Sequence, residues 1–236
     1  LVATAAAVLL LAVALRLFPS DPPYTLAWYC YGAAIVLLLI ALPSLECGWT
    51  GLARRIRVRS RVSFDMRAAL PWAAIGAILI LALALRLYGL QTLPAGLWYD
   101  EASNLSWARQ IERDPGATPV FLASTTHPSL FLMMIAAVVD VTGVTMTAGR
   151  IVGVAFGLAG IVTTFLLVRL MLGSLMGVVA AFLIAVSRWD ISWSRLGMHG
   201  ITAPLFASLT AYLTLRALRG GRASEFGYAG AALGLG

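Results

Sequence analysis

The feature that most constrains this chain is a succession of apolar runs that approach or reach the length needed to cross a lipid bilayer. A hydrocarbon core of roughly 30 Å needs about 20 apolar residues in a helix. The runs cover Leu1–Phe18, Tyr24–Leu42, Leu70–Tyr88, Ile151–Val168, Leu175–Val186 and Ile201–Leu215, and a last one opens near Phe226. Hydrophobic residues make up 61% of the sequence and charged residues 11%, which excludes a soluble domain. We therefore predict an all-α polytopic transmembrane helical bundle.

Basic residues gather in two short stretches beside these runs. The stretches contain Arg54, Arg55, Arg57, Arg59, Arg61 and Arg67, and then Arg216, Arg219 and Arg222. Arginines in this position mark cytoplasmic loops. The net charge of +7 therefore indicates membrane orientation, and we predict no nucleic-acid partner.

This orientation places the polar segment Gly89–Thr126 and the loop Arg188–Gly200 on the outer side of the membrane. The apolar segment Pro128–Val141 is shorter than a span requires. It has to begin and end outside if Arg216 and its neighbours are cytoplasmic, so we predict a helix that lies in the interface or dips partly into it. A full span at Pro128–Val141 is the alternative. The prediction is a long first outer loop that carries short interfacial helices.

Residues able to carry chemistry then fall on the outer face of the membrane. They are Arg86, Asp100, Glu101, His127, Arg150, Arg195 and His199. Any catalysis in this chain is expected at that extracytoplasmic face.

Two adjacent carboxylates, Asp100 and Glu101, follow a turn marked by Pro94 and Gly96. One interpretation is structural, with Asp100 as the N-cap of a helix over Glu101–Glu112 and Glu101 near its positive end. The other is catalytic, because a carboxylate beside a lipid-walled cavity can act as a general base.

Arg86, Arg150 and Arg195 have a similar pair of interpretations. Each can snorkel to lipid head groups, since a guanidinium is costly at membrane depth. Each can also hold a phosphate, because guanidinium geometry matches phosphate oxygens. Three arginines on the same face as two acids favour a site for an anionic lipid head group next to a base.

The two histidines, His127 and His199, allow a divalent metal site together with Asp100 or Glu101, because zinc and manganese take such ligands. No helical spacing links them, so the metal is a secondary possibility. The glycines Gly153, Gly157 and Gly160 predict close helix packing.

Four motifs resemble membrane glycosyltransferases of the GT-C class, most closely the branch of protein O-mannosyltransferases and lipid A aminoarabinose transferases. They are the string from Arg86 to Glu101, Thr126–Leu130 in place of His-Pro-Pro-Leu, Ala148–Ile151, and Ser187–Gly197. Ser129, Arg188 and Asp190 depart from the family pattern. The resemblance covers about Leu70 to Gly220.

The resemblance implies transfer of a sugar from a polyprenyl-phosphate donor to an acceptor hydroxyl, with inversion. It implies that Asp100 is the base with Glu101 beside it, and that Arg150 and Arg195 hold the donor phosphate. The acceptor belongs to a lipid, a glycan or a protein.

These expectations divide the chain into residues 1–67, a pair of transmembrane helices with a basic cytoplasmic loop, and residues 68–236, the N-terminal part of a transferase module in a longer protein. The expected location is the plasma (inner) membrane, as a multi-pass protein. A transporter or an inactive transferase-like scaffold are the alternative functions.

Overall fold

The computed structural model describes residues 2–18, 23–58, 66–114, 129–220 and 223–235. Most of the chain in these ranges is helical, and the ranges contain no strand. The helices are α1 (Val2–Leu17), α2 (Thr25–Val58), α3 (Met66–Leu87), α4 (Tyr99–Arg113), α5 (Ser129–Thr142), α6 (Met146–Leu172), α7 (Ser174–Val186), α8 (Arg188–Arg195), the 3-10 turn η2 (His199–Ile201), α9 (Thr202–Gly220) and α10 (Ala223–Leu235). The predicted all-α polytopic fold is confirmed.

Four helical segments of the described chain are long and apolar enough to cross a membrane. They are Thr25–Leu42, Ala69–Leu87, Met146–Leu172 and His199–Gly220. The bent pair α7–α8, with 58° between its two helices, counts as a fifth candidate. The segments Ala3–Leu17 and Leu130–Thr142 are shorter apolar helices. The helix at the expected span Leu1–Phe18 is therefore below the length of the four candidate spans.

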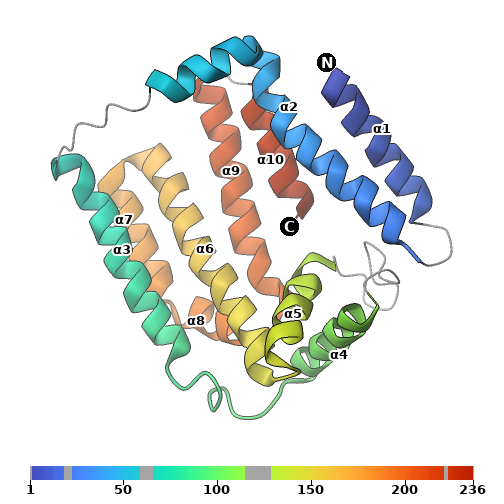
Figure 1. Ribbon diagram of the computed structural model, residues 1–236. Helices are drawn as coiled ribbons and strands as arrows, with labels where there is room; N and C mark the ends of the chain where they lie inside the picture. The colour runs from blue at the N-terminus through green and yellow to red at the C-terminus, as the bar shows by residue number, and fades with distance from the viewer. Residues whose placement is uncertain (1, 19–22, 59–65, 115–128, 221–222, 236) are drawn as a thin grey trace.

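The predicted apolar run Tyr24–Leu42 agrees with the candidate span Thr25–Leu42, but the helix that contains it is longer. Helix α2 continues through Pro43 and the first basic residues to Val58, and its direction changes along its length (Figure 1). A proline inside a helix removes one amide donor and bends the helix axis without always ending it. Arg59, Arg61 and Arg222 lie outside the described residues.

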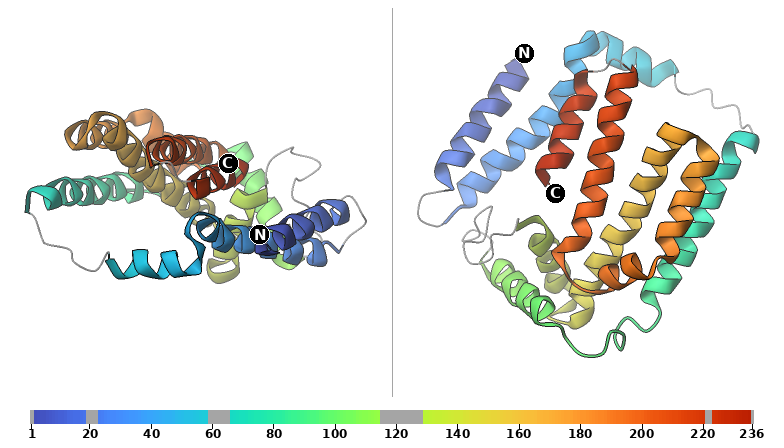
Figure 2. Two further views of the ribbon diagram at one scale, coloured as in Figure 1. Left: turned by 90° about the horizontal axis from the view of Figure 1, so that it is seen from above. Right: turned by 180° about the vertical axis from the view of Figure 1, so that it is seen from behind.

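The helix directions bring one set of helix ends together. Helices α3 and α7 end, and α6 and α9 begin, at the end of the molecule where α4, α5 and α8 lie (Figures 1 and 2). We call this the site end. Helix α5 packs against α4 and α6 there, in keeping with a short interfacial helix.

The buried core of the site end lies between α4, α5, α6 and the start of α9. It includes Leu105, Phe131, Ile135, Phe156 and Leu205. A second core cluster, with Ile75, Ile161 and Phe165, joins α3, α6 and α7. Because two separate clusters rest on α6, this helix is the central support of the fold.

Two of the three α6 glycines noted in the sequence face α8 at close range. A Cβ on Gly153 would lie 2.8 Å from the carbonyl oxygens of both Ser194 and Leu196, and one on Gly157 would lie 2.6 Å from the Ser194 Cβ. Gly160 instead lies beside the backbone of Leu205 on α9. The prediction that these glycines permit close helix packing is therefore confirmed.

We expect Gly153→Ala to lower the free energy of unfolding by about 1–3 kcal/mol, because the added methyl group meets main-chain atoms that cannot move aside. Gly76→Ala on α3 is the matched control, since no atom lies within 4 Å of its Cβ position. Thermal unfolding in detergent measures both. Equal stability of the two variants would contradict the packing.

Candidate active site

The first turn of α4 separates the two adjacent acids. Helix α4 buries Glu101, Leu105, Ala108 and Ile111 along one side, the spacing of a helix face. Asp100 is one residue earlier and therefore about 100° away around the helix axis, where it is exposed. The two carboxylates thus have different surroundings.

The N-cap interpretation of Asp100 is wrong. Trp98 is the N-cap residue and Asp100 already lies inside the helix. The carboxylate that accepts a backbone hydrogen bond at this helix start is Glu101, whose Oε2 lies 3.3 Å from the Trp98 amide nitrogen. A carboxylate at the third helical position that reaches back to the N-cap amide is one half of a capping box.

Glu101 forms a fully buried ion pair with Arg150, the first arginine of α6. Arg150 Nε donates to Glu101 Oε1 at 2.6 Å, and Nη2 donates to Oε2 at 3.2 Å. Both side chains are 0% exposed. Two parallel contacts of this kind fix the relative orientation of the two groups as well as their distance.

The remaining donors of Arg150 hold the loop between α3 and α4. Nη1 donates to the Leu90 carbonyl at 2.7 Å, and Nη2 donates to the carbonyls of Gly96 at 2.9 Å and Pro94 at 3.4 Å. Gly96 has φ +79°, a backbone conformation that glycine adopts without cost. Arg150 thereby fixes the path of the loop that leads to Asp100.

Gly197, after α8, completes this buried cluster. Its amide donates to Glu101 Oε1 at 3.4 Å, and its carbonyl accepts from Asn104 Nδ2 at 2.8 Å. A Cβ on Gly197 would lie 3.1 Å from the carbonyl carbon of Gly149, so the α6 backbone is in close contact here. We call Glu101, Arg150 and Gly197 the brace.

Arg86, at the end of α3, forms a second buried ion pair. Its Nη2 donates to Asp190 Oδ2, and its Nη1 donates to the carbonyls of Ala82 at 3.0 Å and Ala185 at 3.1 Å. The Arg86 side chain is 0% exposed. Asp190, which departs from the family pattern, thus neutralises a buried arginine that belongs to another helix.

Arg195 is the third arginine of the site end. Nη1 donates to the Leu85 carbonyl at 2.9 Å and Nη2 to the Leu93 carbonyl at 2.8 Å. It is 8% exposed and, within the described part of the chain, forms no ion pair with an acid. Arg195 therefore keeps a positive charge that no described carboxylate neutralises.

Asp100 is the exposed acid of the cluster. Among the described residues its carboxylate takes part in no hydrogen bond or ion pair. It lies on the first helical turn that the brace holds, so its backbone is fixed while its side chain remains accessible. An accessible carboxylate on a fixed backbone has the geometry that a general base requires.

The predicted metal ligands are not brought together in the described residues. His127 lies outside those residues, and His199 begins the short turn η2. No group of three or more His, Cys, Asp or Glu able to hold a metal ion occurs within them. Glu101, the fourth suggested ligand, directs both oxygens to Arg150.

Three contributors to the site end were not among the predicted site residues, although the sequence analysis noted Asp190 as a departure from the family pattern. Asn104 and Gly197 clamp α4 to the chain after α8, and Asp190 pairs with Arg86. The sequence marked Asp190 as an unusual acid, whereas no spacing in the sequence indicated the contacts of Asn104 and Gly197.

We expect removal of either brace partner, in Glu101→Leu or in Arg150→Met, to lower the free energy of unfolding by about 3–5 kcal/mol, because one buried charge is left without its partner. The double variant should lose much less than the sum of the two. Arg109→Met, at an exposed position of α4, is the control. Thermal unfolding of all four proteins provides the cycle, and strictly additive losses would show that the pair is not coupled.

The comparisons with known proteins bear on the second half of the chain. Residues 126–236 match the model of the family described as dolichyl-phosphate-mannose-protein mannosyltransferase. No curated protein matches the chain, and no solved structure does. The matched residues include Arg150, Asp190 and Arg195, whereas Arg86 and Asp100 precede them. The match, together with the apolar helices, supports a multi-pass membrane glycosyltransferase of the GT-C type.

Proposed function

We propose that the protein transfers a sugar from a polyprenyl-phosphate donor to an acceptor hydroxyl, with inversion at the anomeric carbon. The active site is the site end, on the extracytoplasmic face of the plasma (inner) membrane. The observation that carries this proposal is the different environment of the two adjacent acids. Glu101 is buried in an ion pair with Arg150, whereas Asp100 is exposed.

Asp100 is the general base of the proposed reaction. Its carboxylate accepts the proton of the acceptor hydroxyl while the hydroxyl oxygen attacks the anomeric carbon. The bond from that carbon to the donor phosphate oxygen breaks, and the polyprenyl phosphate leaves with the bonding electrons. Glu101, which we first considered as a second catalytic acid, acts instead as a positioning residue, because Arg150 occupies both of its oxygens.

Arg195 is the preferred ligand for the donor phosphate. A cation near the leaving phosphate stabilises the negative charge that develops in the transition state. Arg86 and Arg150, which the sequence analysis also placed at the phosphate, are fully buried and paired with acids. We therefore assign these two arginines to positioning the loop and helices around Asp100.

The donor class agrees with the composition and the fold. A sugar carried on a prenyl chain reaches the enzyme through the bilayer. The acceptor is a hydroxyl of a lipid, a glycan or a protein that reaches the same interface.

A transporter is the alternative that the fold has to be compared with. Transporters place their ionisable residues near the bilayer midplane, on broken helices. In α6, which crosses the middle of this bundle, the charged residues Arg150 and Arg169 lie near the two ends. The middle of α6 therefore carries no charged residue of the kind that a transporter places at the bilayer midplane, and this favours an enzyme with its site at one face.

We expect Asp100→Asn to lower kcat for sugar transfer at least about 100-fold, because a neutral amide cannot accept the proton. The donor KM and the melting temperature should change little, since the Asp100 side chain supports no described contact. The measurement is transfer from a polyprenyl-phosphate sugar by the whole protein in proteoliposomes.

Asp140→Asn, at an exposed acid on α5, is the control for loss of one negative charge at the site end. Equal activity of the two variants would remove Asp100 as the base.

Arg195→Ala should raise the donor KM about 10- to 100-fold, the range expected when a charged hydrogen bond to phosphate is lost. Arg188→Ala on the same helix is the control, because Arg188 is exposed at the first position of α8. Steady-state kinetics with variable donor measure the effect, with thermal unfolding run in parallel. An unchanged KM in a stably folded Arg195→Ala protein would exclude Arg195 from the phosphate site.

A further inference from the structure

The end of the bundle opposite the site end carries several arginines. Helices α6 and α9 end there, and α3 and α7 begin there (Figures 1 and 2). We call it the arginine end, because Arg169, Arg216 and Arg219 lie near the ends of α6 and α9. Glu225, on the first turn of α10, is an acid at the same end. The three arginines outnumber this acid, so the arginine end complements a negatively charged partner.

Two of the three arginines have partners within the fold. Arg216 donates from Nε and Nη2 to Glu225 Oε1, at 2.9 Å and 2.7 Å, and this pair neutralises its charge. Arg219 donates from Nη1 to the carbonyl of Leu170, one of the last four carbonyls of α6. Those carbonyls have no partner within the helix, and a basic side chain that covers one stabilises the helix end. Both arginines therefore have a structural role.

Arg169, on the last turn of α6, has no such partner. Its guanidinium forms no hydrogen bond and no ion pair with any residue that the structure describes. It lies over the ring of Trp72 on α3 instead, with 4.8 Å between the guanidinium carbon and the ring centroid. A guanidinium carries five N–H donors, and stacking on a ring uses none of them. The donors of Arg169 are thus free of described protein acceptors.

The position of the Arg169 side chain is fixed by two neighbouring helices. On α7, a Cβ on Gly177 would lie 3.0 Å from the Arg169 Cβ, so the stem of the arginine is in close contact with that helix. On α3, Trp72 packs edge-on against the buried ring of Phe165, with 5.4 Å between the ring centroids. Because Phe165 holds the ring on which the guanidinium lies, Arg169 is oriented before a ligand binds, which lowers the cost of binding.

The surface around Arg169 is apolar and suits a lipid. Leu70 on α3 and Leu175 and Met176 on α7 are exposed, and Trp72 is half exposed. Tryptophan favours the membrane–water interface, and basic sites between transmembrane helices bind anionic lipid head groups. A cation within such a surface fits an amphiphile, whose anionic head contacts the guanidinium while its chains cover the leucines.

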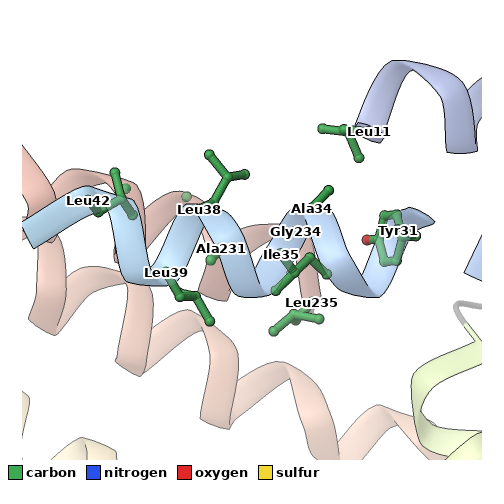
Figure 3. A pocket seen from close by; sticks show the side chains of 12 residues that line it. Leu11, Tyr31, Ala34, Ile35, Leu38, Leu39, Leu42, Ala231, Gly234 and Leu235 are labelled. Carbon is green, nitrogen blue, oxygen red and sulfur yellow. The ribbon is translucent and has the colours of Figure 1, made fainter. Parts of the chain in front are cut away.

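The apolar groove between α2 and α10 (Figure 3) offers no such cation. Of the described residues that line it, Tyr31 alone carries a polar side-chain group. Burial of a charged head group without a partner is costly. Charge therefore distinguishes the two surfaces, and an anionic lipid is expected at Arg169.

We propose that Arg169 and Trp72 form a binding site for the head group of an anionic phospholipid. The guanidinium donates two parallel N–H bonds to phosphate oxygens, while one of its faces stays on the Trp72 ring. Arg219, which contacts the carbonyl of the residue after Arg169, adds positive charge. This inference goes beyond the proposed function and does not require that Asp100 be a base. In the orientation predicted from the basic stretches, the site lies in the cytoplasmic leaflet, whose surface is anionic.

The direct test measures binding of phosphatidylglycerol to the whole protein in detergent by native mass spectrometry. The Kd of the first bound lipid should be at least about tenfold lower than that of phosphatidylcholine, whose head group has no net charge. Arg169→Ala should raise the Kd for phosphatidylglycerol about tenfold, because charged hydrogen bonds are lost. Arg113→Ala is the matched control, since Arg113 also lies in the last turn of its helix but is exposed. Equal Kd changes in the two variants would overturn the site.

Arg169→Gln serves as a second variant if Arg169→Ala has a lowered melting temperature without lipid. It removes the charge and keeps most of the stem that contacts Gly177. An unchanged Kd in a stably folded Arg169→Gln protein would overturn the proposal equally.

Trp72→Leu separates a built site from diffuse attraction to a basic surface. This variant keeps every arginine and removes the ring that orients Arg169, so the Kd for phosphatidylglycerol should rise about fivefold, the range of one cation–π contact. Trp189→Leu, at an exposed tryptophan of α8, is the control for loss of an indole ring. An unchanged Kd in Trp72→Leu would show attraction by net charge alone and would overturn the site.

Soluble phosphates distinguish a lipid from a free anion. Glycerol 3-phosphate and inorganic phosphate in large excess should leave phosphatidylglycerol binding unchanged, because neither has chains that cover Leu70 and Leu175. Displacement of the lipid by either compound would show a site for a soluble anion. Equal Kd values for phosphatidylglycerol and phosphatidylcholine would show a surface that accepts any phospholipid. Either result would overturn the proposal.

Discussion

The buried pair of Glu101 and Arg150 is the interaction on which the site end depends. Removing two charges from water is expensive, and an apolar pair of similar volume is often as stable or more so. What this pair adds is position. Arg150 holds carbonyls of the loop before α4, and Glu101 holds the N-cap amide and the Gly197 amide. Four separate segments are thereby fixed around one guanidinium, and the first turn of α4 is fixed with them.

The glycine surface of α6 makes the rest of the arrangement possible. Because Gly153 and Gly157 carry no side chain, the backbone of α8 can approach α6 closely. From that position Asp190 reaches Arg86, and Arg195 reaches carbonyls at the end of α3 and in the following loop. Gly153 and Gly157 thus determine the positions of Asp190 and Arg195, since a larger residue at either glycine would move α8 and the contacts that these two charged residues make.

Much of the fold could be predicted from apolar run lengths, because lipid forces backbone hydrogen bonds to be satisfied within each helix. Alternation of spans also predicted that Arg86, Asp100, Arg150 and Arg195 share one end. Which acid pairs with which arginine could not be predicted, since spacing along the chain says nothing about contacts between helices. One signal was available and was not used. Glu101 lies at helical spacing from Leu105 and Ala108, which places it on the buried side of α4 and Asp100 off that side.

Adjacent acids on one helix point in different directions, because their side chains leave the axis about 100° apart. Once Glu101 is turned toward Arg150, Asp100 has to point elsewhere, and on the first turn of α4 it is exposed. The position suits a reaction whose two substrates come from different phases. In the proposed reaction the prenyl-linked donor comes from the lipid phase, whereas an acceptor hydroxyl and its proton require contact with water. Asp100, the proposed base, lies on a braced but exposed turn, which is the position that such a reaction requires.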